Sequence, residues 1–323
     1  MGYTNNPTYG RGQHVIGSDA ILVESAAEFA ARLRAHFTSP GYTPPLLPAV
    51  ALEVHALAQQ SNVDVAKVVE VMRKDPMLAG RVLKIAQSAA FAPVGTITSL
   101  QDAVVRLGLR NLSEIAWEVS LGMRVFRSQA YAEAMEIVRR HSTACAYLAR
   151  MVSGFTSIAS EYAFLCGLLH DIGMAAALIV LGEQKATAGG LDPTLLGPAL
   201  QQCHQEASGV VAGLWRLPAD VQLVLAHHHD VMIDGFVHPL AAVVALAEEL
   251  TRDVGLGIVL QGYDCDVTSD TALAHARNAL GFDPARMDKL RQEAKKLISM
   301  LERGAAVAAA VSEDQPRAKR SKR

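Results

Sequence analysis

The sequence predicts an all-α protein. Its apolar residues recur with the 3.6-residue period of a helix along almost the whole chain, and no run of alternating β-branched residues with hairpin turns predicts a sheet. Half of the 323 residues are hydrophobic, so the chain can bury a substantial core. A first helical layer is followed by a second helical part that carries most of the histidines.

The pattern divides the chain into four segments. We expect a flexible N-terminal tail at 1–20, an N-terminal helical lobe at 21–126, a second helical lobe that includes the C-terminal helices at 127–303, and a flexible basic tail at 304–323. The first tail is rich in Gly, Asn and Pro, and the last one ends in SEDQPRAKRSKR. Such compositions do not supply the apolar surface needed for packing.

The early helices have readable starts. An apolar 3.6-residue pattern begins at Val50, after a run of prolines, and we place the first helix there. Asn62 or Asp64 can then cap a helix that runs to about Arg73. Both residue types accept hydrogen bonds from the exposed N–H groups of a first helical turn.

The next two helices are bounded by caps and a glycine. Asp75 followed by Pro76 predicts an N-cap and a first-turn proline for a helix that continues to about residue 89. Thr98 or Ser99 starts the stretch SLQDAVVRLGL, and Gly108 is its natural end.

The remaining helices are predicted from periodicity and breakers. We expect helices at about 111–126 and 131–153, a loop with a short helix at about 182–200, and a second polar connection at about 253–270. Asp283-Pro284 opens a last amphipathic helix, which we expect Gly304 to close.

Charge and cysteine usage restrict the partners. Lys and Arg number 30 against 32 Asp and Glu, so the overall charge does not attract nucleic acid or an anionic membrane, although the basic end at 317–323 offers a weak nucleic-acid contact. Apolar stretches are interrupted before the roughly 20 residues that span a bilayer. The four cysteines form no C-x-x-C pair. We therefore expect a cytoplasmic protein with no membrane span and no structural disulfide.

Histidines and carboxylates recur in an order that predicts a metal site. The set begins at His141, continues through the adjacent pair His170-Asp171 in the apolar run FLCGLLHDIGMAAALIV and through His204, and ends with the AHHHD stretch at 227–230 and Glu248. Imidazole and carboxylate are ligands of Fe, Mn, Zn and Ni, and one Asp can bridge two metals. Ligation would also neutralise charge that is costly to bury.

Each member of this set has a simpler interpretation when it is taken alone. A His-Asp pair in a core can be a hydrogen-bonded structural pair, and three histidines at a helix end can be a solvated terminus that interacts with the helix dipole. Glu248, which lies beside another glutamate, can be a surface carboxylate. The ordered combination is more specific than any of its members.

Several long segments resemble one bacterial family. They are LPAVALEVHALA, VVEVMRKDPMLAGRVLKIAQSAAF, TITSLQDAVVRLGLRNL, RRHSTACAYLAR, AFLCGLLHDIGM, CHQEASGVVAGLWRLPADVQLVLAHHH and LAAVVALAEEL. In order and spacing they are similar to the HDOD family, the HD-related output domain of bacterial signalling proteins, from about Leu47 to about Leu250. The resemblance implies an N-terminal helical lobe followed by an HD-like helical bundle.

The same resemblance implies a ligand set. The family is related to HD phosphohydrolases and to the HD-GYP phosphodiesterases of cyclic di-GMP signalling. By resemblance, one metal falls on His141, His170, Asp171 and Glu248, and the ligands of a second fall on His204, His228 and His229. The implied cofactor is one or two divalent ions of Fe, Mn, Zn or Ni.

The chain departs from its catalytic relatives at several positions. Glu248 stands where the last HD ligand is normally Asp, and Met174 replaces the lysine that would contact a phosphate in HD-GYP enzymes. Ser208 stands where the family usually has Gly, and Gln87 where it usually has Asn. The GYP signature after the double histidine is absent.

Three functions follow from these observations. The favoured one is a signal-transduction output or scaffold protein that acts through contacts with a signalling partner and lacks efficient catalysis. The alternative is a metal-dependent phosphohydrolase acting on a nucleotide or cyclic dinucleotide, in which Asp171 would bridge the metals and serve catalysis. The third is a sensor that binds a metal or nucleotide without turnover.

Overall fold

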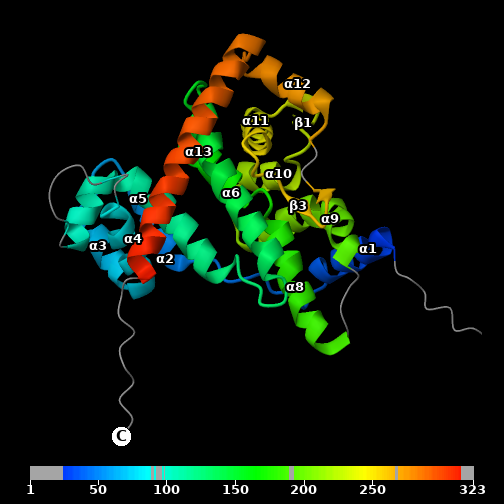
Figure 1. Cartoon of the computed structure of the whole chain (residues 1–323), viewed down its shortest axis with the longest axis horizontal. Coiled ribbons are helices and arrows are strands. Elements are labelled where there is room, and N and C mark those ends of the chain that lie inside the picture. Colours follow the sequence, from blue (N-terminus) through cyan, green and yellow to red (C-terminus); the bar gives the residue numbers. More distant parts are fainter. Residues whose placement is uncertain are drawn as a thin grey trace, which may run out of the picture.

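The computed structural model describes residues 25–88, 91, 97, 99–188, 193–265 and 268–313. Within these residues nearly all regular structure is helical, which confirms the all-α prediction (Figure 1). The predicted tail at 1–20 and the basic stretch at 317–323 lie outside the described residues.

Among the described residues, the first part of the chain contains five helices whose starts follow local sequence signals. They are α1 (Ala26–Phe37), α2 (Ala49–Ala58), α3 (Val65–Arg73), α4 (Pro76–Ala86) and α5 (Leu100–Arg124). The Asp64 carboxylate caps α3, and the Asp75 carboxylate accepts the N–H of Leu78 in the first turn of α4. Helices α2 to α5 pack against one another as one lobe. The preceding helix α1, which the apolar pattern did not predict, packs on α9 of the second lobe.

Gly108 divides α5 into two parts. Its φ of 73° and ψ of 158° are not helical, and such a left-handed φ favours glycine. The helix predicted to end at Gly108 and the helix predicted at 111–126 are therefore the two halves of α5.

The second part of the chain forms the histidine-bearing lobe. Its helices are α6 (Ala132–Ser153), α7 (Ser160–Leu169), α8 (Ile172–Ala188), α9 (Pro193–Leu214), α10 (Ala219–Ala226), α11 (Pro239–Asp253), α12 (Asp270–Ala279) and α13 (Pro284–Glu313). Helix α6 packs against α7 and α11, and α9 packs against α8 and α10. This arrangement brings these six helices around one interior.

Two boundary predictions were wrong. The stretch at 182–200 is not a loop with a short helix, because α8 continues to Ala188 and α9 begins at Pro193, where a first-turn proline is well tolerated. The last helix does not end at Gly304 but runs on to Glu313. The alanine-rich residues after Gly304 are strong helix formers, and one glycine costs only about 1 kcal/mol within a helix.

In the part of the chain that the structure describes, two very short hairpins interrupt the helices. Strands β1 (Met232–Ile233) and β2 (Phe236–Val237) pair antiparallel, as do β3 (Val259–Leu260) and β4 (Tyr263–Asp264). Both residues of each tight turn have positive φ, at 52° and 81° for Asp234-Gly235 and at 50° and 80° for Gln261-Gly262. Such two-residue turns match the twist of the strands that they join. Strands of two residues leave no alternating pattern by which a sheet could be predicted.

The apolar run around the His-Asp pair is a buried helical hairpin. By length and composition the segment Tyr162–Glu183 could cross a membrane, with a mean hydropathy of 2.1, but 94% of its most apolar window is buried inside the protein. His170 and Asp171 form the turn between α7 and α8 within it. This burial is typical of a core segment of a globular protein.

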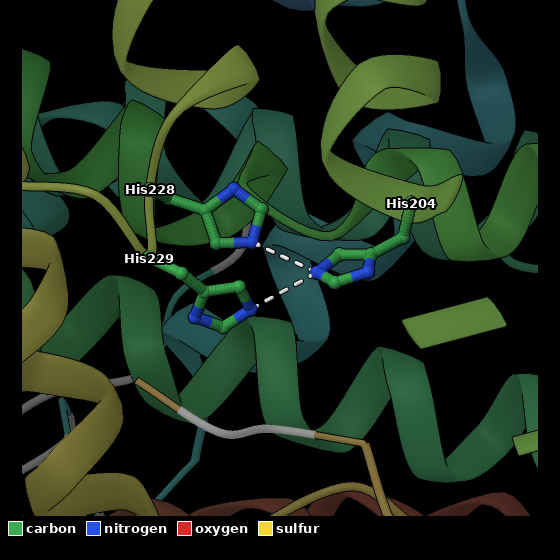
Figure 2. Close-up of side chains that lie close together, drawn as sticks. All are labelled: His204, His228 and His229. Atoms are coloured by element: carbon green, nitrogen blue, oxygen red, sulfur yellow. Dashed lines mark hydrogen bonds between the residues drawn. The ribbon is translucent and has the colours of Figure 1, made fainter. Parts of the chain in front are cut away.

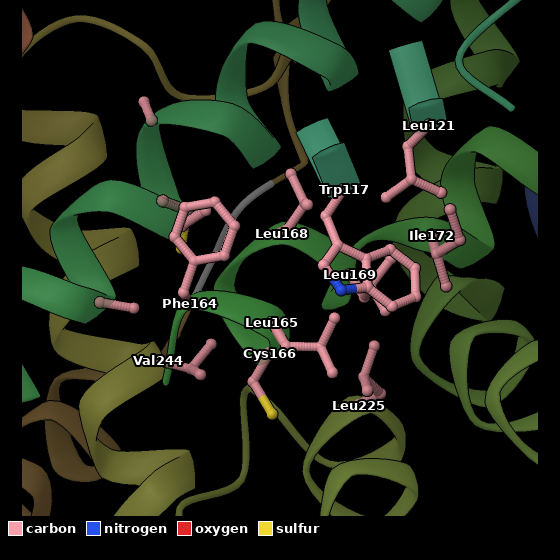
Figure 3. Close-up of a cluster of buried hydrophobic side chains, with 14 of the residues drawn as sticks. Trp117, Leu121, Phe164, Leu165, Cys166, Leu168, Leu169, Ile172, Leu225 and Val244 are labelled. Carbon is pink, nitrogen blue, oxygen red and sulfur yellow. The ribbon is translucent and has the colours of Figure 1, made fainter. Parts of the chain in front are cut away.

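One continuous core joins both lobes. Trp117 of α5 packs in a cluster with Leu169 of α7, Leu225 of α10 and Val244 of α11 (Figure 3). All four side chains are at most 2% exposed. The first lobe therefore packs directly on helices that carry the candidate ligands.

The first and last helices connect distant parts of the fold. Helix α1 packs on α9, where Arg34 forms an ion pair of 3.1 Å with Glu206, and among the described residues it has no comparable contact with the helices of the lobe that follows it in sequence. Helix α13, orange to red in Figure 1, runs from α11 along α6 to α4. The domain limits at 21–126 and 127–303 stay a prediction.

Candidate metal centre

The seven candidate ligands lie together in the interior of the second lobe. They come from α6, the α7–α8 turn, α9, the residues just after α10, and α11, in the order His141, His170, Asp171, His204, His228, His229 and Glu248. Six of them are at most 1% exposed, and the side chain of His229 is 13% exposed. The structure thus assembles every residue of the predicted set, while their role as ligands stays a prediction.

Close helix packing places the His-Asp turn. A Cβ atom on Gly167 of α7 would lie 2.8 Å from the carbonyl oxygen of Cys145 on α6. A Cβ atom on Gly173 of α8 would lie 2.1 Å from the carbonyl oxygen of His204 on α9. Only glycine allows these backbones to approach so closely. The turn is therefore held directly between α6 and α9.

The first group of ligand atoms surrounds one oxygen of Asp171. Its Oδ2 lies 3.1 Å from Nε2 of His170 and 3.6 Å from Nε2 of His141. Nε2 of His170 is also 3.4 Å from Oε1 of Glu248. The four residues offer ligand atoms that all lie within 4.8 Å of one another.

The second group faces the other oxygen of Asp171. Nε2 of His204 and Nε2 of His228 each lie 3.5 Å from Oδ1. Figure 2 shows His228 and His229 pointing toward His204 from the opposite side, with Nε2–Nε2 distances of 3.1 and 3.0 Å. Asp171 therefore lies between the two groups and presents one oxygen to each, as a bridging carboxylate does.

Backbone carbonyls set the tautomer of four histidines. Carbonyl oxygens only accept hydrogen bonds, so each Nδ1 that contacts one must carry the proton. These contacts are His141 to Leu256 at 2.9 Å, His170 to Gly167 at 2.9 Å, His204 to Gln201 at 3.0 Å and His228 to Leu225 at 3.0 Å. In the neutral rings the lone pair is then on Nε2, which is the arrangement of metal-binding histidines.

The convergent Nε2 atoms fit a bound cation. Nε2 of His141 and Nε2 of His170 are 3.1 Å apart, as close as the Nε2 pairs of the second group. Two lone pairs at such a distance repel each other unless a proton or a metal ion lies between them. Both Asp171 oxygens are buried and receive no hydrogen bond within the described residues. Imidazole nitrogens with carboxylate oxygens suit Fe, Mn, Zn or Ni.

The electrostatics favour the metal-binding protonation states of three of the candidate ligands. Burial lowers the pKa of His204 to about 4, and it also lowers the pKa of His229 well below its usual range. Burial alone would raise the pKa of Asp171, but the neighbouring His170, together with His228 and His204, holds it well below its usual range. At neutral pH these two imidazoles are neutral and the carboxylate is charged, which is what metal ligation requires.

Ser208 joins α9 to the His-Asp turn. Its hydroxyl donates to the carbonyl oxygen of His170 at 2.6 Å and accepts the N–H of Gly173 at 2.9 Å. The side chain is fully buried. The hydroxyl, at a position where the resemblance leads one to expect glycine, thus satisfies two backbone groups on either side of Asp171.

Met174 and Gln87, which also depart from the family pattern, have structural roles. Met174 is fully buried in the core at the start of α8. Gln87 follows the end of α4 and donates to the carbonyl oxygen of Ile97 at 3.0 Å.

Thr268 was missed by sequence reasoning, although its hydroxyl contacts both His229 and Glu248. It lies in a polar connection with no motif around it, so only the folded chain reveals it.

The HDOD domain family model matches residues 45–231, more than half of the 323 residues. The chain belongs to the HDOD family. The matched range contains six of the seven candidate ligands and ends before Glu248. The role of Glu248 therefore depends on its position beside His170 and not on the family match.

Solved structures share the fold of this HDOD protein. An HDOD domain protein from Geobacter sulfurreducens superposes with a TM-score of 0.62 at 22% identity, over 87% of this chain and 98% of that one. A Shewanella amazonensis SB2B protein, provisionally named a metal-dependent phosphohydrolase, gives 0.61 at 17% identity, over 88% and 98%. A provisionally named signal transduction protein from Marinobacter aquaeolei VT8 gives 0.62 at 20%, over 91% and 68%.

A sequence relative extends beyond the matched region. An uncharacterized protein of Treponema pallidum (strain Nichols) is 27% identical over 219 residues, which is 64% of this chain. The match spans 42% of the length of that protein. The family model establishes the family, and the solved structures at these identities establish the fold alone.

Proposed function

We propose that this HDOD protein is a bacterial signal-transduction output module that acts through contacts with a partner protein in the cytoplasm. Its metal centre organises the fold and lacks efficient catalysis. Membership of the output-domain family and the likeness to a provisionally named signal transduction protein support the signalling part of the proposal.

Burial of the ligands is the observation that carries the non-catalytic part. Six of the seven ligand residues are at most 1% exposed, so a phosphate ester could reach the two carboxylates only if surrounding helices separated. Met174 is also fully buried and puts a thioether where the resemblance leads one to expect a lysine. No cation from that position is available to bind a phosphate oxygen.

A bound metal has a structural consequence in this arrangement. The ligands come from α6, α7–α8, α9, the end of α10 and α11, so an ion ligated by them would connect the main helices of the second lobe. A ligand that binds only the folded state stabilises it by about 2.7 kcal/mol at one hundred times its Kd. Metal occupancy would therefore control the rigidity of the surface that a partner contacts.

One observation favours phosphohydrolase activity as the second candidate. Asp171 presents one oxygen to each ligand group, and the side chain of His229 is 13% exposed. Two divalent ions held by these residues would supply positive charge for a phosphoryl transition state and would lower the pKa of a bound water molecule. In that case Asp171 would hold both ions, and the substrate would be a nucleotide or a cyclic dinucleotide such as cyclic di-GMP.

The test combines metal analysis with turnover. Protein purified without chelators is analysed for Fe, Mn, Zn and Ni, and is assayed with cyclic di-GMP and bis(p-nitrophenyl) phosphate. We expect bound metal, and no hydrolysis above that of the Asp171→Asn variant. Turnover that disappears in this variant would overturn the non-catalytic proposal and establish the hydrolase. A metal-dependent change in the small-angle scattering of an inactive protein would instead support the sensor.

A further inference from the structure

Thr268 is a buried threonine between the second hairpin and α12. It is 4% exposed and lies next to Ser269, the N-cap of α12. Its hydroxyl is 2.8 Å from Nδ1 of His229 and 3.0 Å from Oε2 of Glu248. This one hydroxyl contacts His229 of the second ligand group and Glu248 of the first.

The direction of both hydrogen bonds follows from the chemistry of the three groups. The Thr268 hydroxyl donates its proton to Oε2 of Glu248, because a carboxylate oxygen accepts. The Thr268 oxygen must then accept from Nδ1–H of His229. The direct distance from His229 Nδ1 to Glu248 Oε2 is 3.6 Å, which is too long for a hydrogen bond. The hydroxyl is therefore the link between them.

The two bonds orient both ligands. With Nδ1 protonated, the lone pair of His229 is on Nε2, which lies 3.0 Å from Nε2 of His204 in the second group. With Oε2 held by the hydroxyl, Glu248 presents Oε1 to the first group, 3.4 Å from Nε2 of His170. Glutamate has one more rotatable bond than aspartate. The hydrogen bond to Oε2 therefore restricts the Glu248 side chain beforehand and lowers the conformational entropy that metal ligation would otherwise cost.

We propose that Thr268 is a positioning residue that couples the two halves of the metal centre, so that an ion bound by one group favours binding by the other. Ligation of Glu248 would fix the Thr268 hydroxyl, which in turn fixes the tautomer and orientation of His229. The inference rests on the proposed metal centre and adds to it the prediction of cooperative loading through one hydroxyl.

The chain offers matched variants for a test. Thr268→Val keeps the shape and removes the hydroxyl, whereas Thr268→Ser keeps the hydroxyl. Thr251→Val is the control, because Thr251 is also fully buried, lies on α11 close to Glu248, and donates only to the carbonyl oxygen of Ala247 at 2.7 Å. Thermal melting of the metal-free proteins shows whether each variant folds.

The first measurement is titration with Co²⁺, followed by its visible spectrum and by calorimetry. Loss of a partner that orients a metal ligand typically weakens binding by about 10–100-fold. We expect Thr268→Val to weaken the second binding event by this factor and to abolish cooperativity. Thr268→Ser and Thr251→Val should behave like the wild type. Equal, cooperative binding of two ions by Thr268→Val would overturn the proposal.

The second measurement needs no metal. Long-range ¹H–¹⁵N spectra of metal-free protein report histidine tautomers, and we expect the Nδ1–H form of His229 in the wild type and Thr268→Ser but a mixture in Thr268→Val. An unchanged tautomer in Thr268→Val would refute positioning by Thr268. If the wild type bound no ion, the metal centre and the coupling would both fail, and the tautomer would still show whether the hydroxyl orients His229.

Discussion

The contact between α8 and α9 at Gly173 provides a sharp test of how the His-Asp turn is held. A Cβ atom added at this position would lie 2.1 Å from the carbonyl oxygen of His204, 2.6 Å from the backbone nitrogen of Ser208 and 2.9 Å from Cβ of Ala207. Two of these atoms are backbone, so no rotation of a side chain relieves the overlap. The Gly173→Ala variant must push α8 away from α9.

The expected cost follows from this overlap. Over-packing by a single group typically costs about 1–3 kcal/mol, and here a rigid helix must also move by about 1 Å, so we expect about 3 kcal/mol or more. For a domain of this size each kcal/mol lowers Tm by roughly 2–4 °C, which predicts a loss of roughly 6–12 °C. Separation of the helices also moves Asp171 away from His204, so metal content should fall in parallel.

The assay is thermal melting of the metal-free protein, together with metal analysis of protein purified without chelators. Gly80→Ala is the matched control, because a Cβ atom on Gly80 of α4 would meet nothing within 4 Å. This control should gain up to about 1 kcal/mol from the higher helix propensity of alanine. If Gly173→Ala melted at the wild-type temperature and kept its metal, the close approach of α8 and α9 would not be what positions Asp171.

Three further outcomes can be checked with the same material. His228→Ala should lose most bound metal by elemental analysis, whereas His227→Ala, which changes an exposed neighbour, should retain it; equal loss would contradict the assignment. Ser208→Ala leaves two backbone groups without their hydroxyl partner and should lose about 1–3 kcal/mol in urea unfolding; an unchanged midpoint would argue against this role. The pKa of His204 is about 4 in the folded protein and about 6.5 in the unfolded chain, so the unfolded chain binds more protons between these two pH values. The metal-free protein should therefore lose stability as pH falls from 6.5 to about 4. His204→Gln should reduce that slope in unfolding measured across this range.

Local chemistry made much of the helical framework predictable. Asp75 before Pro76 signals a helix start through a carboxylate that accepts backbone N–H groups, and the structure has that cap. Gly108 signals an interruption because its positive φ is costly for other residues. These features depend on neighbours within a few residues, so the sequence carries them directly.

Other elements depend on contacts that are distant in sequence. Helix α1 has only a short apolar face, and its place is set by packing on α9, about 170 residues later. The two hairpins have strands of two residues, too short for any periodic pattern. The run after Gly304 continues α13 because alanine's helix propensity outweighs one glycine.

The sequence by itself determined the helical class and the ordered set of histidines and carboxylates, because periodicity, caps and spacing are local properties of the chain. The tertiary structure decided how that set is used. Folding turns one oxygen of Asp171 to each ligand group, assigns the proton of each carbonyl-bound histidine to Nδ1, and brings the Thr268 hydroxyl between His229 and Glu248. Hydrogen-bond direction and distance are properties of three-dimensional packing, so no linear pattern could contain them.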